Sequence, residues 1–248
     1  IGQQDMKILA LDSSGQAASV ALAEDGCLRA KFTVNYKKTH SQTLVPMMDE
    51  IKKLLDLDLT TIDAVAVASG PGSFTGLRIG SATAKGLGLA LQIPLVEVPT
   101  LEGLAYNLCG VSTLVCPLMD ARRGQVYTGV YAFRKKGQDF LPEAVIPQGA
   151  VEIDEILEQI NELGREVIFL GDGVPVFQQR IEETMKVPYS FAPVHRLQQS
   201  AASVAALGAV YYAEGRAIDA DEHVPEYLRQ SQAERERAQK GIIDYEIK

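Results

Sequence analysis

The segment with the clearest chemical potential is a glycine-rich stretch that begins at Ser69, SGPGSFTGLRIGSATAKGLGLAL. It fails both common phosphate-loop patterns. Gly76 is followed by Leu77 and Arg78 rather than by Lys and Ser or Thr, and Thr75 stands where the dinucleotide fingerprint has its third glycine. A glycine turn before a helix can still bind an anion through free backbone N–H groups. The alternative is a plain tight turn between a strand and a helix.

Small residues recur at every fourth position of the helix that this segment predicts. Each interior glycine costs roughly 1 kcal/mol relative to alanine, so the repeat needs a compensating contact. That contact lies either inside the monomer, against the sheet or a neighbouring helix, or between chains, where a partner's helix approaches backbone to backbone. We favour the second hypothesis, in which the small residues face outward at Gly72, Gly76, Gly80, Ala84 and Gly88.

A second predicted helix supports pairing between chains. Apolar residues over 44–55 cover more than one face of this helix, and two adjacent methionines supply adaptable apolar surface. The alternative is a thoroughly buried monomer core. The partner or dimer interface is therefore predicted at Leu44, Met47, Met48, Ile51, Leu55, Gly72, Gly76, Gly80 and Ala84.

The remaining reactive residue types form no recognisable catalytic set. The histidines His40, His195 and His223 are isolated, and His40 has no identifiable nucleophile and carboxylate with which to act as a general base. Three cysteines without a C-x-x-C spacing favour a reducing compartment. The formal charge of −8 argues against nucleic acid or an anionic membrane as a ligand of the whole surface.

The elements that must position these residues alternate between strand and helix. Period-two apolar residues and the Asp25-Gly26 turn predict a three-stranded meander from Lys7. Helices and strands then alternate at 44–55, 63–69, 75–91, 94–98 and from Thr100. Residues 9–26 can be laid over 117–137, and 65–78 over 167–179, in the same order. Two such matches suggest a duplication, and hence two similar α/β lobes with a cleft between them.

The domain organisation follows from this duplication. An uncharged stretch over 103–119 contains Pro117 and several polar residues, so a buried helix–loop–strand passage is expected there rather than a membrane span. Residues 1–5 are expected to be a leftover of an expression vector, with Met6 as the native start. The predicted units are a first lobe over 6–108, a smaller second lobe over 112–199, a helix over 200–215 that packs back on the first lobe, and a polar tail over 222–248.

Several of these segments together resemble the bacterial TsaB (YeaZ) family. The resemblance rests on MKILALDSSGQAASVALAEDG, HSQTLVP, VAVASGPGSFTGLRIGSATAKGLGLAL and IPLVEVPTLEGLA, and more weakly on GDGV (171–174) and PEYLR (225–229). It implies an α/β fold of two ribonuclease-H-like lobes, as in the actin/sugar-kinase/Hsp70 (ASKHA) superfamily, with a reduced second lobe.

The resemblance also implies a function in tRNA modification. It implies a cytoplasmic, non-catalytic scaffold in the complex that forms N6-threonylcarbamoyladenosine at position 37 of ANN-decoding tRNAs. The implied partners are TsaD and TsaE, with tRNA bound through the complex and a homodimer when the chain is alone. Pairing with TsaD is implied through the helices over 41–56 and 75–91.

Two sites of the wider superfamily are expected to be degenerate. TsaD carries an H-x-E-G-H metal motif where this chain has Thr100 and Leu104 at the ligand positions, so no metal site is expected. No cofactor is expected either, with weak nucleotide binding left open, since the hairpins lack a glycine-rich run of phosphate-facing amides. The degenerate nucleotide cleft is assigned to Asp12, Ser13, Ser14, Asp120, Gly171 and Gly173.

Other interpretations remain open at this point. Arg122 and Arg123, which follow Asp120, contact either an acidic partner or RNA, or they form a solvated turn. The two-lobed duplication and Asp12 also fit an active ATPase or small-molecule kinase. A metallopeptidase is the third alternative, and it would require a bound metal.

Overall fold

The computed structural model describes residues 6–36 and 38–228, which form two lobes, each built on one β-sheet. The first sheet has the order β11-β5-β4-β1-β2-β3, in which β1 pairs antiparallel with β2 and parallel with β4. Its strands are β1 (Lys7–Asp12), β2 (Ala18–Glu24), β3 (Cys27–Val34), β4 (Ala64–Ala68), β5 (Leu95–Val98) and β11 (Ala217–Ile218).

Both faces of the first sheet are covered, which explains why its central strands are almost wholly apolar. Successive residues of a strand point to opposite faces. Leu9 and Leu11 of β1 therefore join the core under α1 (His40–Leu54) and α2 (Phe74–Leu91). Ile8 and Ala10 join the core under α6 (Ala201–Ala213) on the other face. Helix α1 begins at His40 after the N-cap Thr39 and contains most of the apolar residues that predicted a helix here.

The second sheet repeats the pairing pattern of the first. Its order is β10-β9-β6-β7-β8, with β6 antiparallel to β7 and parallel to β9. Helices α4 (Ile153–Leu163) and α5 (Val174–Thr184) cover one face, and α3 (Thr100–Ala105) covers the other. The strands are β6 (Leu114–Arg122), β7 (Gln125–Lys136), β8 (Asp139–Glu152), β9 (Val167–Leu170) and β10 (Tyr189–Phe191), and the short 3-10 helices are η1 (Leu59–Thr61), η2 (Tyr106–Leu108) and η3 (Val194–Arg196).

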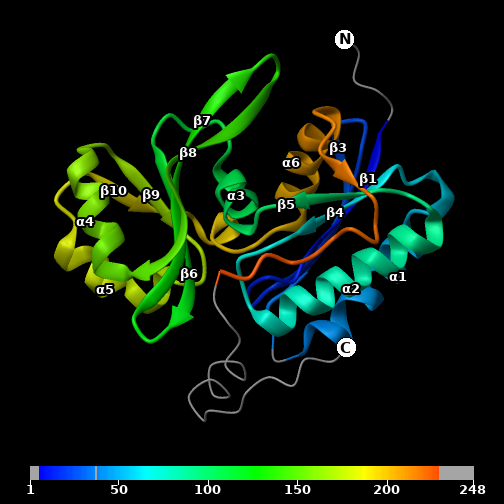
Figure 1. Ribbon diagram of the computed structural model, residues 1–248, viewed down its shortest axis with the longest axis horizontal. Coiled ribbons are helices and arrows are strands. Elements are labelled where there is room, and N and C mark those ends of the chain that lie inside the picture. Colours follow the sequence, from blue (N-terminus) through cyan, green and yellow to red (C-terminus); the bar gives the residue numbers. More distant parts are fainter. Residues whose placement is uncertain (1–5, 37, 229–248) are drawn as a thin grey trace, which may run out of the picture.

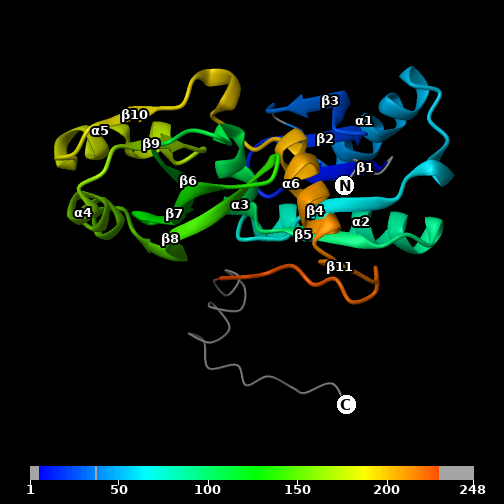
Figure 2. The same ribbon diagram turned by 90° about the horizontal axis from the view of Figure 1, so that it is seen from above.

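The two lobes lie side by side, with the second lobe on the left of Figure 1 and the first on the right. Helices α1 and α2 lie together on the lower side of the first sheet, and the β7–β8 hairpin projects at the top of the view (Figure 1). Figure 2 shows α6 crossing the first sheet after the chain returns from the second lobe. The fold therefore places the β1–β2 and β6–β7 turns and the start of α2 near the junction of the lobes.

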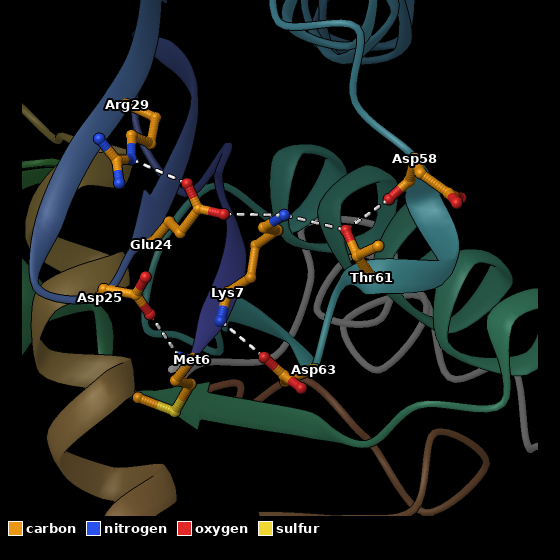
Figure 3. Close-up of polar contacts among 8 residues, drawn as sticks. All are labelled: Met6, Lys7, Glu24, Asp25, Arg29, Asp58, Thr61 and Asp63. Carbon is orange, nitrogen blue, oxygen red and sulfur yellow. Dashed lines mark hydrogen bonds and ion pairs between the residues drawn. The ribbon is translucent and has the colours of Figure 1, made fainter. Parts of the chain in front are cut away.

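A network of polar contacts fixes the outer end of β1, far from that junction (Figure 3). The Lys7 Nζ atom lies 2.9 Å from a Glu24 carboxylate oxygen and 3.0 Å from Thr61 Oγ1. The Lys7 backbone N–H donates to Asp63 at 2.6 Å, and the Met6 N–H donates to Asp25 at 2.8 Å. These contacts join the start of β1 to the β2–β3 turn and to the segment before β4.

The chain beyond β11 includes the first residues of the predicted polar tail. Residues 219–228 pack on the first lobe as an extended segment, which we call the C-terminal strap (orange in Figure 2). His223 is buried between Ser81 Oγ at 2.8 Å and Glu97 Oε1 at 2.5 Å. The contacts of His223 with Ser81 and Glu97 anchor the strap to the first lobe. Ser81 is only 5% exposed, so its hydroxyl is not accessible to a substrate as a nucleophile. Residues 1–5 and 229–248 of the expected vector leftover and tail lie outside the described residues.

Candidate functional site

A cleft of about 410 Å³ lies between the lobes and is the candidate ligand site. One wall comes from the β1–β2 turn and the start of α2, and the other from the β6–β7 turn and the loop after β9. Of the six residues predicted for a nucleotide cleft, Ser14 and Asp120 line it. The full lining is Ser14, Gly15, Gln16, Gly72, Ser73, Phe74, Met119, Asp120, Ala121, Arg122, Tyr127 and Asp172.

The first-lobe wall is held together by its own hydrogen bonds. The Asp12 carboxylate accepts bonds from the backbone N–H of Ser14 at 3.0 Å and from its hydroxyl at 2.6 Å. The Ser14 carbonyl accepts from the Ser73 N–H at 2.7 Å, and Ser13 Oγ donates to the Gly76 carbonyl at 2.8 Å. Burial raises the pKa of Asp12 above its usual range, although the bonds from Ser14 act in the opposite direction. Asp12 and Ser13 therefore lie behind the cleft wall, inside the first lobe.

The glycine stripe of α2 fits against this turn, so the prediction that it faces a partner is wrong. A Cβ atom added at Gly72 would overlap the Ser14 carbonyl, and one added at Gly76 would overlap the Ser13 carbonyl. At Gly80 it would overlap Ser13 Oγ, and at Gly88 it would lie 2.7 Å from the Ala220 Cβ. Ala84 is buried in the core beneath α2. The stripe consists of small residues because the helix lies against backbone of its own chain.

The predicted interface on α1 is only partly at the surface. Leu44, Met47 and Ile51 are buried in the core of the first lobe, which corrects their assignment to a partner interface. Met48 is half-buried and Leu55 is 40% exposed, so these two remain available to a partner. Helical periodicity made the apolar residues conspicuous, but it did not reveal which of them the sheet covers.

The second-lobe wall carries more charge. Asp120 accepts a bond from the Arg122 backbone N–H at 2.8 Å, and its carboxylate lies 3.2 Å from the Arg122 guanidinium. Gly173 donates its N–H to the Leu118 carbonyl at 2.9 Å, and a Cβ at Gly171 would overlap that carbonyl. The two glycines thus bring their loop against β6, with Asp172 facing the cleft.

Asp172 has an unusual environment. Burial raises its pKa to about 6, and the neighbouring Asp120 carboxylate contributes to the increase. Its Oδ1 atom is buried without a hydrogen-bond partner. The wall therefore presents carboxylates rather than a row of free backbone N–H groups, a poor arrangement for binding a polyphosphate.

Aromatic residues at the cleft escaped the sequence reasoning. Phe74 and Tyr127 both line it, and Tyr227 of the strap packs on Phe74 with ring centroids 4.6 Å apart. The Arg78 guanidinium also packs on Phe74, with its central carbon 4.0 Å from the ring centroid. Phe74 is the first residue of α2 and Tyr127 lies near the start of β7, in different lobes, so only the fold brings them to one cleft.

The positions that correspond to the metal ligands of TsaD have structural roles. Thr100 is buried, and its hydroxyl accepts the Gly70 N–H at 3.0 Å. Leu104 is buried in the core between α3 and the second sheet. Over residues 6–36 and 38–228, no cluster of three or more His, Cys, Asp or Glu side chains could hold a metal ion.

No helix within residues 6–36 and 38–228 is both long enough and apolar enough to cross a bilayer.

The sequence is similar to a family of proteins of tRNA modification and to two individual relatives. Residues 28–237 match the model of the family described as TsaD: tRNA N6-adenosine threonylcarbamoyltransferase. The chain is 36% identical to the tRNA threonylcarbamoyladenosine biosynthesis protein TsaB of Bacillus subtilis (strain 168), over 92% of this chain and 96% of that one. It is 30% identical to TsaB of Escherichia coli (strain K12), with the same coverage.

A solved structure is similar over almost the whole fold. YeaZ from Pseudomonas aeruginosa superimposes with a TM-score of 0.76 at 26% identity, covering 90% of this chain and all of the other. The repeated sheet order confirms the predicted ASKHA-type fold of two ribonuclease-H-like lobes. The chain therefore belongs to the TsaB (YeaZ) family of tRNA threonylcarbamoyladenosine biosynthesis proteins.

Proposed function

We propose that this chain acts in the cytoplasm in the biosynthesis of threonylcarbamoyladenosine on tRNA, as a non-catalytic scaffold that pairs with TsaD. In this proposal TsaE and tRNA join through the resulting complex, and the chain forms a homodimer when TsaD is absent. The observation that carries the proposal is an exposed face of α2 next to α1 that is made of small and apolar residues. In the part of the chain that the structure describes, nothing packs within 4 Å of a Cβ placed at Gly86 on this face.

Gly86 is the centre of that face. A Cβ added there would meet nothing within 4 Å, unlike one at Gly76 or Gly80. An exposed glycine inside a helix costs roughly 1 kcal/mol relative to alanine, and among residues 6–36 and 38–228 no contact offsets this cost. Ala82 and Leu89 lie on the same helix face, and Leu89 is 59% exposed. The backbone of a second helix can approach closely only where the side chains on the surface are as small as these.

Helix α1 extends the same surface with larger apolar groups. Val45 is 57% exposed, and Met48 and Leu55 lie on the same flank of the helix. Neighbouring exposed apolar side chains on two packed helices are typical of a surface that another protein covers. The small face of α2 and this apolar flank together form the proposed pairing surface.

The first-lobe turn supports the non-catalytic part of the proposal. The groups that would receive a phosphate, the Ser14 N–H and hydroxyl, bind Asp12 instead, and the start of α2 occupies the space beside them. The carboxylates of Asp120 and Asp172 on the opposite wall would repel a triphosphate.

Substitution of Gly86 tests the pairing surface. Gly86→Glu places a charge on the proposed surface, so we expect it to abolish co-elution with TsaD in size-exclusion chromatography. Helical content by circular dichroism should be unchanged, because the added side chain points into open space. Val176→Glu is the matched control, since Val176 is a 56% exposed apolar residue on α5 in the other lobe. Retained co-elution of Gly86→Glu with TsaD would refute the proposal.

An active ATPase or small-molecule kinase is the second candidate, favoured by the cleft of about 410 Å³ between the lobes. Calorimetric titration with Mg-ATP separates the two functions. The scaffold proposal predicts weak or no binding and no turnover. Tight binding with turnover that Asp12→Ala abolishes would favour the enzyme instead.

A further inference from the structure

The chain passes between the two lobes twice, and Asn107 fastens the two passages to each other. One passage runs from β5 through α3 and η2 to β6, and the other runs from β10 through η3 to α6. The Asn107 Nδ2 atom donates to the carbonyl oxygens of Arg196 and Gln198, at 3.0 and 2.7 Å. Its Oδ1 atom accepts from Ser203 Oγ at 2.6 Å. The two passages thus form one connection, about which the lobes could rotate as about a hinge.

The C-terminal strap lies on the other side of the junction. In Figure 2 the passage into α6 runs along the upper side of the molecule, whereas the strap runs along the lower side and ends beside the second lobe. Figure 1 shows the same end of the strap at the junction of the lobes. Rotation about a hinge moves two lobes furthest apart on the side away from it, so a contact made by the strap opposes that rotation effectively.

The strap is fixed to the first lobe before it reaches the junction. Ala220 is buried in the core under α2, where a Cβ atom added at Gly88 would lie 2.7 Å from the Ala220 Cβ. The Lys85 Nζ atom donates to the carbonyl oxygens of Asp221 and His223, at 2.9 and 3.0 Å. The buried His223 ring also contacts one side chain of α2 and one of β5. The strap therefore moves with the first lobe.

Glu226 joins this anchored strap to the second lobe. Its backbone N–H donates to the carbonyl of Ser69, which follows β4 in the first lobe, at 2.7 Å. A Cβ atom added at Gly70 would overlap the Glu226 carbonyl, so the strap backbone lies directly against this turn. The Glu226 carboxylate instead accepts a hydrogen bond from Gln148 Nε2 on β8, at 3.0 Å. One residue therefore bonds to both lobes.

The second lobe meets the strap at two neighbouring strands. The Gln148 Oε1 atom is buried, and among the described residues it has no hydrogen-bond partner, so the bond from Nε2 to Glu226 is what fixes this amide. Burial raises the pKa of Tyr131 on β7, and the carboxylates of Glu102 and Glu226 add to the increase. The Glu226 side chain is thus close to the second sheet at both β7 and β8.

We propose that the C-terminal strap is a latch, anchored on the first lobe and fastened to the second by the bond between Glu226 and Gln148, that holds the cleft at one width. Many two-lobed proteins close around a ligand by rotation about a hinge. In this chain the latch opposes that rotation from the side opposite Asn107. Its release would also uncover a ring that lines the cleft, because Tyr227, next to Glu226, packs on Phe74.

The test compares the orientation of the two lobes by backbone N–H residual dipolar couplings of the isotopically labelled full chain. A rigid body has one alignment tensor, so the couplings of both lobes of the unmodified chain should fit a single tensor. In the double variant Glu226→Ala, Tyr227→Ala the population of open chains should rise roughly fivefold for each hydrogen bond that is lost. The fit to a single tensor should then be lost, because the two lobes tumble partly independently.

The matched control is the double variant Glu222→Ala, Val224→Ala. It removes one carboxylate and one larger side chain from the same strap at two exposed positions, so a single tensor should still fit. Two tensors in both double variants would overturn the inference, because any change to the strap would then loosen the lobes. A single tensor in the Glu226→Ala, Tyr227→Ala chain would overturn it too, as would two tensors in the unmodified chain.

Gln148→Ala breaks the same bond from the second lobe and leaves the strap itself unaltered. It should likewise require two tensors, and a single tensor would show that Glu226 does not fasten the lobes. Adding Gln148→Ala to Glu226→Ala should separate the lobes no further than either substitution alone, because both remove one bond. A further separation in the combined variant would contradict the latch. All these substitutions leave Gly86 intact, so the outcome does not depend on pairing with TsaD.

Discussion

The β1–β2 and β6–β7 turns occupy equivalent places in the two sheets, yet they have opposite environments. The first runs through Asp12, Ser13 and Ser14, all buried, and its polar groups bond to one another and to the start of α2. The second runs through Arg122 and Arg123, which are exposed and carry the strained backbone. The β1–β2 turn is therefore part of the core of its lobe, whereas the β6–β7 turn lies at the surface.

The neighbouring helix accounts for this difference. Helix α2 has glycines where it approaches the first turn, so it lies directly against Ser13 and Ser14. In the second lobe the equivalent place holds the loop over 171–173, in which two glycines pack on β6 and leave Asp172 facing the cleft. The two sheets thus have the same strand order, but the packing of the neighbouring helix or loop determines whether the turn is accessible to a ligand.

The largest expected effect concerns the buried turn. Gly76→Ala should lower the free energy of unfolding by about 3 kcal/mol, because the added methyl group overlaps the Ser13 carbonyl, a backbone atom that cannot move aside. Gly86→Ala on the same helix should instead raise it by about 0.5–1 kcal/mol, since its methyl group meets open space. Urea unfolding of both variants measures the difference. Equal effects would mean that α2 does not lie against the first turn as described.

The second prediction concerns the charged wall of the other lobe. The raised pKa of Asp172, about 6, means that the folded chain binds the proton more tightly than the unfolded chain does. The contribution of Asp172 to the unfolding free energy should therefore fall by about 2 kcal/mol as the pH rises from about 4 to about 6. Because burial also raises the pKa of Asp12 and of Glu102, Asp172→Asn should remove only the part that depends on Asp172. Urea unfolding of the variant and of the unmodified chain across the range measures that part as a difference.

Asp154→Asn is the matched control for that experiment. Asp154 is half-exposed, and its pKa is lowered by Arg180, so its substitution should leave the fall between pH 4 and pH 6 in place. If Asp172→Asn retains the same fall, the carboxylate is not buried as the structure places it.

The smallest effect tests the strain in the exposed turn. Arg123→Gly should raise the free energy of unfolding by about 1 kcal/mol, because glycine adopts a φ of 58° without a steric cost. Arg134→Gly, in the regular strand β7, should lower it by a similar amount. Thermal unfolding resolves both, and a loss of stability in Arg123→Gly would show that the arginine side chain stabilises the turn more than its backbone strains it.

Much of the fold could be predicted from the sequence because it depends on local patterns. Alternating apolar residues and the Asp25-Gly26 turn predicted the meander, and the repeated segments predicted two lobes of the same construction. The predicted helices at 44–55 and 75–91 correspond to α1 and α2. Period and turn chemistry are properties of neighbouring residues, so they can be read before any tertiary contact is known.

The candidate site was less accessible to the same reasoning. Asp12, Ser13, Ser14 and Asp120 were placed at the correct turns, but Asp12 and Ser13 proved to lie behind the cleft wall. Phe74 and Tyr127 were not predicted, because their proximity arises from two lobes meeting.

The sequence by itself determined which residues share a helix face or a strand end, including the small-residue stripe of α2. Only the tertiary structure decided what that stripe faces: the turn of its own lobe covers it, while Gly86 on the opposite side remains open. The physical reason is that a periodic pattern specifies a direction around a helix axis. What lies in that direction depends on contacts between residues far apart in the chain.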